Sequence, residues 1–365
     1  LAMRSPANTV NASSTVLAVA PFSVSGSANL DGTGLANAIA TRLGGQRVLP
    51  VRRLTADTQS QDRRSDATHI VAGEVTQSGN DVIVVARLED IAGGTTLWSE
   101  RIHVRSDELF SVESVVAERV VATLRLRLAA AEQDRLRRRY TSNGAAYEGY
   151  LRGRAALVEY TPDGTKRAIQ AFEDALVRDP QYALARAGLA MASADMYLRF
   201  APTSDVEQWG ERAETEARAA LNLDSDLAEA HLARAAVARK REFDWNATME
   251  ASRRALLLNP NLDQAHLFMA AAYYHLGYMD EALIEMEKGR QLHGPDIVEP
   301  RRIEALVALF SGRFAPAAVH LAEVSRLSSQ AIGDTYLALA HYYSGAAVRA
   351  RTLLESLANN PSASS

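Results

Sequence analysis

The chain has 365 residues, of which 47% are hydrophobic and 23% are charged. This composition excludes a disordered, collagen-like or membrane-bundle protein, and the length allows two domains at about 150 residues each. The 40 basic and 44 acidic residues give a net charge of -4, whereas a nucleic-acid-binding protein carries a large basic excess. Cysteine is absent, which excludes disulfides, thiolate nucleophiles and cysteine-based zinc sites.

The two ends of the chain suggest a piece of a longer protein. Residues 1–14 lack the apolar core of a secretion signal, so we expect a flexible leader or linker there. No stretch approaches the roughly 18 apolar residues of a membrane-spanning helix, so we expect no membrane insertion in this region. The chain begins at Leu1 without an initiator methionine, and its last helical pattern stops at Asn359-Asn360-Pro361. We therefore expect truncation at the carboxyl terminus.

Residues 15–106 have the alternating pattern of an α/β domain. Thr15–Phe22 is a short apolar run of strand character. Asp31–Gly34 then breaks the chain, and apolar residues at helical spacing follow over Leu35–Leu43. Arg47–Val51 is predicted to be the next strand. The pattern therefore begins as strand, helix, strand.

The second part of this domain predicts a hairpin and a further strand. His69–Val75 and Asp81–Leu88 flank Ser78-Gly79-Asn80, which is typical of a hairpin turn. Gly93-Gly94 supplies another turn before the last strand, Thr95–Val104. We expect the order βαβαβββ, with about five strands in a mixed sheet and two to three helices.

A single long helix is predicted for Asp107–Arg139. Its apolar residues recur at helical spacing, namely Leu109, Phe110, Val116, Val120, Leu124 and Leu128. We expect this helix to pack on the sheet and then leave it, so that residues 107–144 form a connecting helix and hinge.

Residues 145–365 read as short paired helices without strands. A small residue followed by an apolar or small one four positions later, and another three after that, recurs six times. The first members are Ala168, Ala213, Thr248, Ala282, Ala317 and Ala350, which are 45, 35, 34, 35 and 33 residues apart. A period near 34 is typical of the tetratricopeptide repeat, in which small residues let neighbouring helices pack closely. We expect an all-α solenoid of about six repeats.

Other residues support the same register. Asp179-Pro180 and Asn259-Pro260 follow the small position by the same interval, and Gly277, Gly312 and Gly345 precede it by the same interval. The spacing of 45 predicts an insertion of about 11 residues in the second repeat. We expect this insertion around Phe200–Gln208, where it would lengthen the helices or form a loop.

Several short motifs carry a more specific resemblance. They are Val16–Phe22, Ala72–Val75, Ala86–Asp90, Leu97–Glu100 and Asp107–Phe110, with Tyr150–Arg154 and Ala168–Ala175 at the junction to the repeats. In sequence and order they resemble the TolB-amino-terminal-like domain of bacterial signalling proteins, which is similarly followed by tetratricopeptide repeats. The resemblance covers nearly the whole chain from about Thr15.

The resemblance also implies a context for this region. In that family it usually forms the carboxyl-terminal part of a protein with an amino-terminal effector. The effector is an adenylate or guanylate cyclase, a winged-helix transcriptional regulator or a serine/threonine kinase, often joined through one membrane helix. A periplasmic or other extracytoplasmic position is favoured on this ground, and a cytoplasmic one is left open.

The motifs for catalysis or metal binding are weak. Asp31–Gly34 lies where backbone N–H groups could hold a phosphate, but it lacks the full phosphate-loop and dinucleotide patterns, so we favour a turn and helix cap. His231 and His266 occupy equivalent repeat positions, which favours packing over a metal site. No Gly-x-Ser-x-Gly or His-Glu-x-x-His motif occurs. We expect no catalytic residues, no cofactor and no metal.

A basic run, Arg135-Leu-Arg-Arg-Arg139, ends the predicted long helix. It could meet an acidic partner or lipid head groups. We favour a solvated helix end, where cations offset the negative pole of the helix dipole.

The first helix of each repeat provides the candidate binding residues. In a solenoid these helices line a concave groove, which recognises a ligand through side chains at fixed positions in each repeat. The third repeat offers Glu229, Leu232, Arg239 and Lys240; the fourth Gln264, Leu267, Tyr274 and His275; the fifth Arg302, Leu309 and Phe310; the sixth Thr335, Tyr342 and Tyr343. Aromatic and basic groups together suit an extended peptide or a carboxylate-bearing segment. The alternative is that many of them pack between repeats. Asp195 and Met191 of the second repeat are weaker candidates.

Two hypotheses for function follow. The first is a non-catalytic sensory or scaffolding region that binds a protein or peptide in the repeat groove and passes this state to an effector outside the chain. The second is an α/β domain that binds a small ligand at the carboxyl ends of its strands, near Ser23–Asp31, with the repeats as structural or oligomerisation support. An enzyme ranks third, and a homodimer is left open.

Overall fold

The computed structural model describes most of the chain, which folds as two compact units. The first unit comprises Leu1–Leu151 with Asn259–Asn261, and the second comprises Arg152–Leu258 with Leu262–Ser365. The described residues are 15–26, 31–46, 49–54, 67–159, 161–202, 204–292, 298–327 and 331–359. No helix among these residues has the length and apolar character needed to cross a bilayer.

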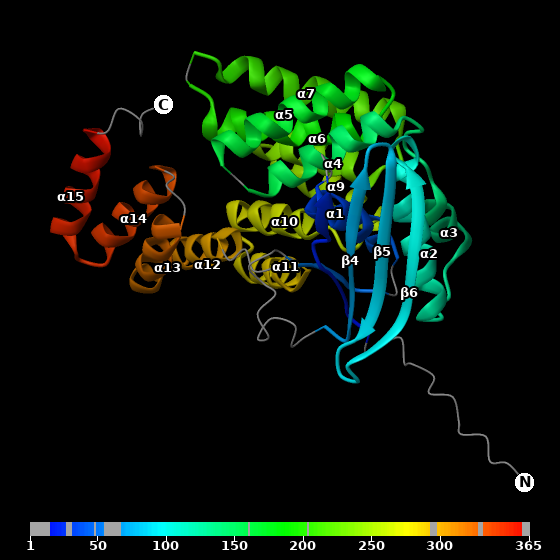
Figure 1. Cartoon of the computed structure of the whole chain (residues 1–365). Helices are drawn as coiled ribbons and strands as arrows, with labels where there is room; N and C mark the ends of the chain where they lie inside the picture. The colour runs from blue at the N-terminus through cyan, green and yellow to red at the C-terminus, as the bar shows by residue number, and fades with distance from the viewer. Residues whose placement is uncertain are drawn as a thin grey trace, which may run out of the picture. The chain divides into compact units, whose positions relative to one another are not determined.

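The first unit is built on the mixed sheet that the sequence predicts (Figure 1). Its strands are β1 (Leu17–Val19), β2 (Ser23–Gly26), β3 (Val51–Arg53), β4 (His69–Ser78), β5 (Asp81–Asp90) and β6 (Thr95–Arg105). The order is β3-β1-β4-β5-β6. The pairs β3-β1 and β1-β4 are parallel, and β4-β5-β6 form an antiparallel meander.

The predicted strands differ from the observed ones in two places. The run Thr15–Phe22 is broken after Val19, and the chain then resumes as β2, a strand that the sequence did not predict and that pairs with β4 further along. The predicted strand Arg47–Val51 shares only Val51 with β3, and its residues 47–48 lie outside the described residues. The second expected helix, between β3 and β4, falls on residues 55–66, which lie outside the described residues. The hairpin at Ser78–Asn80 is confirmed, with Ser78 opposite Asp81.

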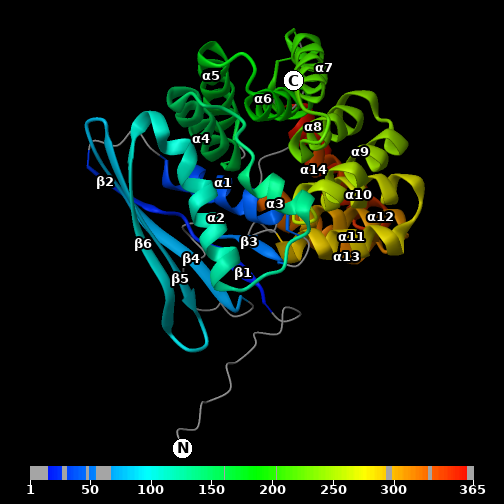
Figure 2. The same ribbon diagram turned by 90° about the vertical axis from the view of Figure 1, so that its right-hand side faces the viewer.

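Helices α1 (Gly32–Gly44) and α2 (Val112–Thr123) cover one face of the sheet (Figure 2). Alternate residues of β5, such as Val84 and Leu88, are fully buried, as are Val116 and Val120 of α2. Burying these aliphatic side chains contributes about 1.5–3 kcal/mol each. This layer is the core of the first unit.

Asp31 caps α1, which confirms the turn-and-cap interpretation of Asp31–Gly34. Its Oδ1 accepts hydrogen bonds from the N–H groups of Thr33 (2.8 Å) and Gly34 (3.0 Å). A Cβ at Gly32 would lie 1.9 Å from the carbonyl oxygen of Phe22, so the glycine permits close packing of the turn. The N–H groups that a phosphate would need are occupied by the aspartate.

The long helix predicted for Asp107–Arg139 is wrong. The chain instead forms a 3₁₀ turn, η4 (Ser106–Ser111), then α2, a break, and α3 (Ala130–Arg137). The break follows from Arg125, whose φ of 53° places it in the left-handed region. There Leu126 N–H donates to the Val121 carbonyl (3.0 Å) and Arg125 N–H to that of Ala122 (3.1 Å), the Schellman pattern that ends a helix.

The basic run at the end of α3 is partly engaged within the first unit. Arg137 pairs with Glu118 of α2 (3.2 Å), and the guanidinium of Arg139 lies 5.5 Å from the ring centre of Phe110. The carbonyls at this helix end are contacted by a cation from α1. Arg42 donates a hydrogen bond to the carbonyl of Leu136 (2.7 Å). The solvated-end interpretation therefore holds only in part.

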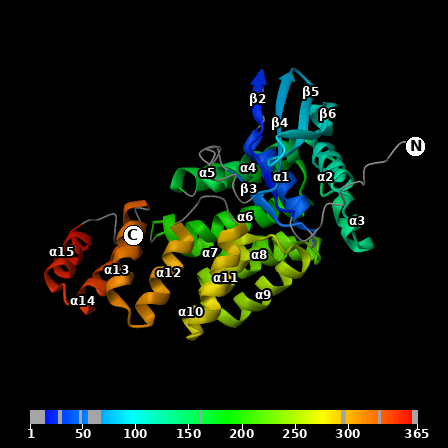
Figure 3. The ribbon, with the colours of Figure 1, turned by 90° about the horizontal axis from the view of Figure 1, so that it is seen from below.

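The second unit continues the chain as a tetratricopeptide-type array of helix pairs (Figure 3). Six helix pairs follow one another in the described residues, and in the last five the first helix packs on its own second helix. The pairs are α4 (Gly144–Val158) with α5 (Pro162–Arg178), α6 (Ala183–Asp195) with α7 (Val206–Leu223), α8 (Ala228–Val237) with α9 (Trp245–Leu258), α10 (Asp263–Leu276) with α11 (Met279–Leu292), α12 (Val298–Phe310) with α13 (Phe314–Leu327), and α14 (Ala331–Tyr343) with α15 (Ala347–Ala358). Helix α4 begins in the first unit.

The repeat signature has a direct structural cause. All six of the small residues that set the period are buried, so they allow the second helix of each pair to approach its neighbours. Gly277, Gly312 and Gly345 have positive φ and end α10, α12 and α14 with Schellman turns. The insertion of the second repeat is taken up by a π-helical turn, a loop and the 18-residue helix α7.

Candidate functional site

Four first helices of the second unit lie next to one another and carry the candidate site. Helix α6 contacts α8, α8 contacts α10, and α10 contacts α12. We call the surface that these four helices form the first-helix face. It holds six charged residues in mutual contact, which we call the basic cluster: Asp195, Arg199, Arg239, Lys240, Glu299 and Arg302.

Two π-helical turns position the basic residues. Helix α6 continues into η5 (Met196–Phe200), which carries Arg199, and α8 continues into η6 (Ala238–Glu242), which carries Arg239 and Lys240. The two turns contact each other. A π turn adds a residue to one helical turn and so redirects the side chains that follow, and such turns are frequent at functional sites.

The turn η6 ends in a strained residue. Phe243 has a φ of 53°, a left-handed conformation that costs a residue other than glycine roughly 1–2 kcal/mol. At the matching helix ends of the next three repeats this conformation is taken by glycine. Phe243 is nevertheless 58% exposed and contacts Trp245 with ring centres 6.2 Å apart. Strain at one helix end, beside the basic cluster, is a feature of functional sites.

Glu299, in the first turn of α12, lies at the centre of the basic cluster. Its carboxylate accepts two hydrogen bonds from Arg302, at 2.5 Å from Nη2 and 2.9 Å from Nε. Arg239 donates to it at 3.0 Å, and Arg199 lies within 3.9 Å. One carboxylate therefore faces three guanidinium groups, which are rigid forks suited to binding a further carboxylate.

Charge around Glu299 is strongly unbalanced. Burial alone would raise the pKa of its carboxyl group, but Arg302, Arg239 and Arg199 outweigh burial and hold the pKa well below its ordinary value. Glu299 is therefore ionised at neutral pH. It is the carboxylate that these three arginines share, and Arg199 and Arg302 have further partners besides it.

Lys240 adds a buried cation beside these arginines. Its ammonium group forms an ion pair with Asp195, and the two residues are only 3% and 4% exposed. Burial lowers the pKa of Lys240 despite the attraction of Asp195, and Arg199 and Arg239 lower it further. The cluster as a whole contains four basic and two acidic groups, so it carries a positive excess in a poorly solvated place.

The pKa of His275, at the end of α10, is affected by the positive charge of the basic cluster. Burial lowers its pKa most, and Arg239 and Arg302 lower it further, to about 4. The imidazole is therefore neutral at pH 7. It stacks on Trp245 with ring centres 4.0 Å apart and an angle of 11° between the rings.

Aromatic rings border the cluster. The guanidinium of Arg239 lies 5.0 Å from the ring centre of Phe268, a cation–π contact. Phe310 lies 6.3 Å from His275 and 5.9 Å from Tyr274. The face therefore offers fixed cations next to flat apolar rings.

The structure divides the predicted groove residues into four groups, of which the pair Tyr342 and Tyr343 is described separately below. Leu232, Leu267, Tyr274 and Leu309 are buried, so they pack within and between repeats, which is the alternative that the sequence left open for the groove residues. Arg239, Lys240, His275, Arg302 and Phe310 come together at the basic cluster. Glu229, Gln264 and Thr335 lie on α8, α10 and α14 and are partly or fully exposed.

Tyr342 and Tyr343 form a separate aromatic group at the end of α14. They are 62% and 56% exposed, their ring centres are 5.3 Å apart, and Tyr343 stacks on Phe314 at 5.0 Å. They belong to the sixth repeat, beyond the four helices of the first-helix face. We treat them as an extension of that surface.

Five residues at the site were not predicted, namely Arg199, Phe243, Trp245, Phe268 and Glu299. Arg199 sits at the edge of the insertion of the second repeat, where the repeat register could not be counted. Glu299 lies 18 residues before Ala317, the same offset as Gln264 before Ala282, so the register pointed to this position but the candidates of the fifth repeat did not include it. Trp245 begins a second helix, so a search of first helices omits it. A first helix that continues one turn beyond its expected end is the feature that could have identified Arg199.

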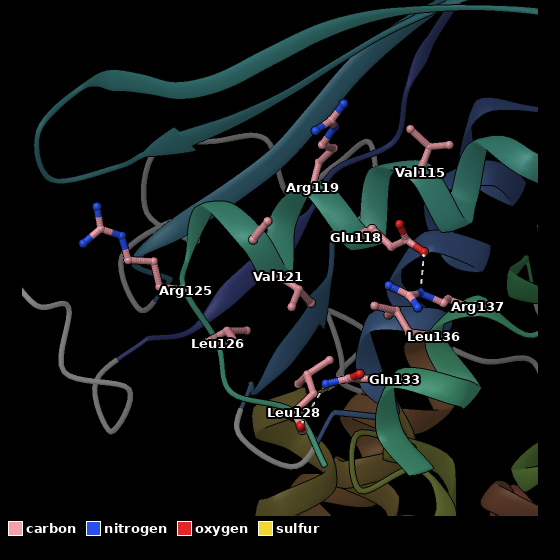
Figure 4. Close-up of a pocket in the computed structure, with 11 residues that line it drawn as sticks. Val115, Glu118, Arg119, Val121, Arg125, Leu126, Leu128, Gln133, Leu136 and Arg137 are labelled. Atoms are coloured by element: carbon pink, nitrogen blue, oxygen red, sulfur yellow. Dashed lines mark hydrogen bonds and ion pairs between the residues drawn. The ribbon is translucent and has the colours of Figure 1, made fainter. Parts of the chain in front are cut away.

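A pocket of about 670 Å³ lies in the first unit, between α2 and α3 (Figure 4). Its aliphatic lining includes Val121, Leu126, Leu128 and Leu136. Glu118 and Arg137 face each other at one end, and Arg125 lies at the opposite end of α2. This is not the place near Ser23–Asp31 where the second hypothesis put a ligand. Of that segment, residues 27–30 lie outside the described residues.

Comparison with known proteins gives one curated relative and several solved structures. No protein-family model matches the chain. A protein described as putative adenylate cyclase 3, from Rhizobium meliloti (strain 1021), is 26% identical over 155 residues. The match covers 42% of this chain and 25% of that protein, so the chain corresponds to only part of its length.

The solved structures are repeat proteins. PilW, described as a widely conserved type IV pilus biogenesis factor, is 19% identical with a TM-score of 0.41, over 58% of this chain and 93% of that one. The thermophilic TPR protein TTC0263 of Thermus thermophilus is 18% identical with a TM-score of 0.39, over 56% and 98%. PilF of Pseudomonas aeruginosa is 16% identical with a TM-score of 0.38, over 57% and 90%.

Proposed function

We propose that this chain is a non-catalytic binding region of a bacterial signalling protein. Its first-helix face binds an extended, carboxylate-bearing segment of a partner protein, and the bound state passes to an effector domain outside the chain. The observation that carries this proposal is the basic cluster, in which three arginines share one carboxylate.

The cluster favours an acidic ligand for electrostatic reasons. A partner carboxylate at Arg239 and Arg302 would offset their positive field, which adds to burial in lowering the pKa of His275. In a poorly solvated place this attraction is stronger than at an open surface. Truncating one member of such a desolvated contact typically costs about 2–5 kcal/mol of binding energy.

The surrounding rings suit a peptide better than a small ion. Phe243, Trp245 and Phe310 present apolar area beside the charges, and aromatic residues with arginine dominate the energetics of protein interfaces. Phe243 keeps its exposed ring at the expense of backbone strain. Tyr342 and Tyr343 would extend the contact along the repeats.

The signalling context is proposed on sequence similarity. The motifs of residues 15–110 resemble the TolB-amino-terminal-like domain, and the curated relative is described as a putative adenylate cyclase. In this proposal the effector is a cyclase, a kinase or a winged-helix regulator. We place the region outside the cytoplasm, as the distal part of a membrane-anchored protein.

Fluorescence anisotropy with a defined probe tests the binding step. The probe is a labelled peptide of alternating glutamate and tyrosine, and its counterpart has glutamine for each glutamate. We expect saturable binding of the glutamate peptide and at least about tenfold weaker binding of the glutamine peptide, which corresponds to about 1.4 kcal/mol. Arg239→Gln and Arg302→Gln should each weaken binding by a similar factor.

Controls separate the site from general charge effects. Arg218→Gln removes one cation from an exposed position on the second helix α7, and it should leave binding unchanged. Glu299→Gln removes the internal carboxylate that competes for the arginines and should strengthen binding. Circular dichroism checks that each variant is folded. Equal binding of the two peptides, or equal loss in Arg218→Gln and Arg239→Gln, contradicts the proposal.

A further inference from the structure

We infer that the pocket between α2 and α3 is a binding site for a single-chain aliphatic carboxylate. The site lies in the first unit and is independent of the first-helix face. Its volume of about 670 Å³ is within the range of small-molecule sites, roughly 300–1,000 Å³.

The hollow follows from how the two helices are joined. Helix α2 buries one face against the sheet and α1, through Val112, Val116 and Val120. Arg125 then turns the chain, and α3 runs back alongside, so that Arg137 near its end pairs with Glu118 in the middle of α2 (3.2 Å). The helices are thus joined at two places, the turn at Arg125 and the Arg137–Glu118 ion pair, and the pocket lies between these two places (Figure 4).

Six of the eleven lining residues are aliphatic, and the other five are polar or charged. Val121, Leu126 and Leu128 are partly exposed, and Leu136 closes the floor as a buried residue. Within the described part of the chain, the titratable groups that line the pocket are Glu118 and three arginines, and no aromatic ring joins them. The aliphatic part of the lining offers a place for a hydrocarbon chain, and the arginines at its edge offer cations for a head group.

The charges select an anionic head group. Of the three lining arginines, Arg137 is paired with Glu118 and Arg119 is paired with Glu100 of β6 (2.8 Å). Among the described residues Arg125 has no carboxylate partner, and it is exposed. Because Glu118 is already neutralised, the described lining offers one free cation and no free anion. A carboxylate at Arg125 completes the charge balance.

The backbone of Arg125 supports a functional role. It is one of two described residues other than glycine with positive φ, and the other is Phe243, beside the basic cluster. The same Schellman turn ends three helices of the second unit with glycine. Arginine here accepts backbone strain that glycine would remove, and such strain is kept where the side chain is needed.

Isothermal titration calorimetry of the whole chain tests this site. The probes are sodium dodecanoate and dodecyltrimethylammonium bromide, each below its micelle concentration. We expect saturable binding of dodecanoate and none of the cation at the same concentrations. Arg125→Gly should weaken dodecanoate binding at least about fivefold, since it removes a charged hydrogen-bond donor.

A stability measurement makes the test specific. Arg125→Gly also relieves the left-handed strain, so thermal unfolding without ligand should shift upward by about 2 °C. A purely structural Arg125 would lose stability and binding together. Arg127→Gly is the matched control, because it removes the same charge from a neighbour outside the lining and should leave dodecanoate binding unchanged.

A second variant tests the apolar wall. Leu128→Asp places a carboxylate in the pocket at a partly exposed position, so the protein should fold and lose dodecanoate binding. Equal binding of the anionic and cationic probes, or dodecanoate affinity that survives both Arg125→Gly and Leu128→Asp, overturns the inference. None of these outcomes bears on peptide binding at the first-helix face.

Discussion

Asp195 and Lys240 occupy equivalent positions in the first helices of adjacent repeats, and their side chains form a buried ion pair. The two residues are 45 residues apart, the same spacing as the starts of α6 at Ala183 and α8 at Ala228. Opposite charges at one register position therefore tie the second repeat to the third. The insertion lies after Asp195, so it does not disturb this register.

Breaking this pair on one side should destabilise the protein strongly. Asp195→Leu leaves an unpaired ammonium group in the interior, which costs about 3–5 kcal/mol of the free energy of unfolding. The double variant Asp195→Leu/Lys240→Met replaces both charges by apolar groups of similar size and should recover most of that loss. Urea denaturation of the two variants and the wild type measures both effects.

An exposed pair provides the control for this cycle. Arg254 and Asp226 are 2.9 Å apart at the surface, so Arg254→Met should change the free energy of unfolding by less than about 1 kcal/mol. If Asp195→Leu costs no more than Arg254→Met, the Asp195–Lys240 pair is not buried in solution.

Glu299 should make stability depend on pH in the acid range. Its folded pKa is lowered, so its ionised form contributes stability that is complete above the unfolded value of about 4.3 and is lost as the pH falls through the folded pKa. Glu299→Gln cannot titrate. The stability difference between wild type and Glu299→Gln, measured by urea denaturation, should be constant from pH 7 to about pH 5 and shrink below about pH 4. A difference that grows with acid would show that the three arginines do not hold the charge.

The repeats could be predicted because they require certain residues to recur at a regular spacing in the sequence. Small residues must recur wherever helices cross closely, and glycine must recur where a helix ends in a left-handed turn. The break between α2 and α3 could not be predicted in this way. Arg125 is a good helix former, and apolar residues continue at helical spacing through Leu124 and Leu128, so only the backbone conformation reveals the turn.

The site could be predicted only where it follows the register. Arg239, Lys240, His275 and Arg302 were found by their repeat offsets, and the structure places them near one another. Offsets do not say which apolar positions face outward, and Leu232 and Tyr274, which were candidates by register, are buried. The carboxylate at the centre, Glu299, reaches the arginines through a contact between repeats that no local pattern encodes.

The glycine turns allow a backbone prediction. Gly312 has a φ of 73°, and a Cβ at this position would have no atom within 4 Å, so Gly312→Ala is penalised by conformation alone. We expect a loss of about 1 kcal/mol in the free energy of unfolding. Ser311→Ala, one residue earlier, is the control and should change it by less than about 0.5 kcal/mol. A neutral Gly312→Ala would mean that the turn adopts another conformation in solution.

His275 gives a direct readout of ligand charge at the basic cluster. Burial, Arg239 and Arg302 lower its pKa from 6.5 to about 4, so the folded protein keeps the ring neutral between these values while the unfolded chain protonates. Stability from this group is therefore complete above pH 6.5 and declines as the pH falls toward 4. His275→Gln should remove that decline, as measured by urea denaturation across this range.

Binding of an acidic peptide should move this pKa in a defined direction. A carboxylate at Arg239 and Arg302 cancels part of their field, so the pKa of His275 rises toward 6.5 and binding takes up a proton between pH 4 and 6.5. Affinity for the glutamate peptide should increase as the pH falls from about 6.5 toward about 5, before the peptide itself protonates. NMR titration of the imidazole resonance, assigned with His275→Gln, measures the shift with and without peptide. An unchanged pKa in the presence of saturating peptide would place the peptide carboxylates away from Arg239 and Arg302.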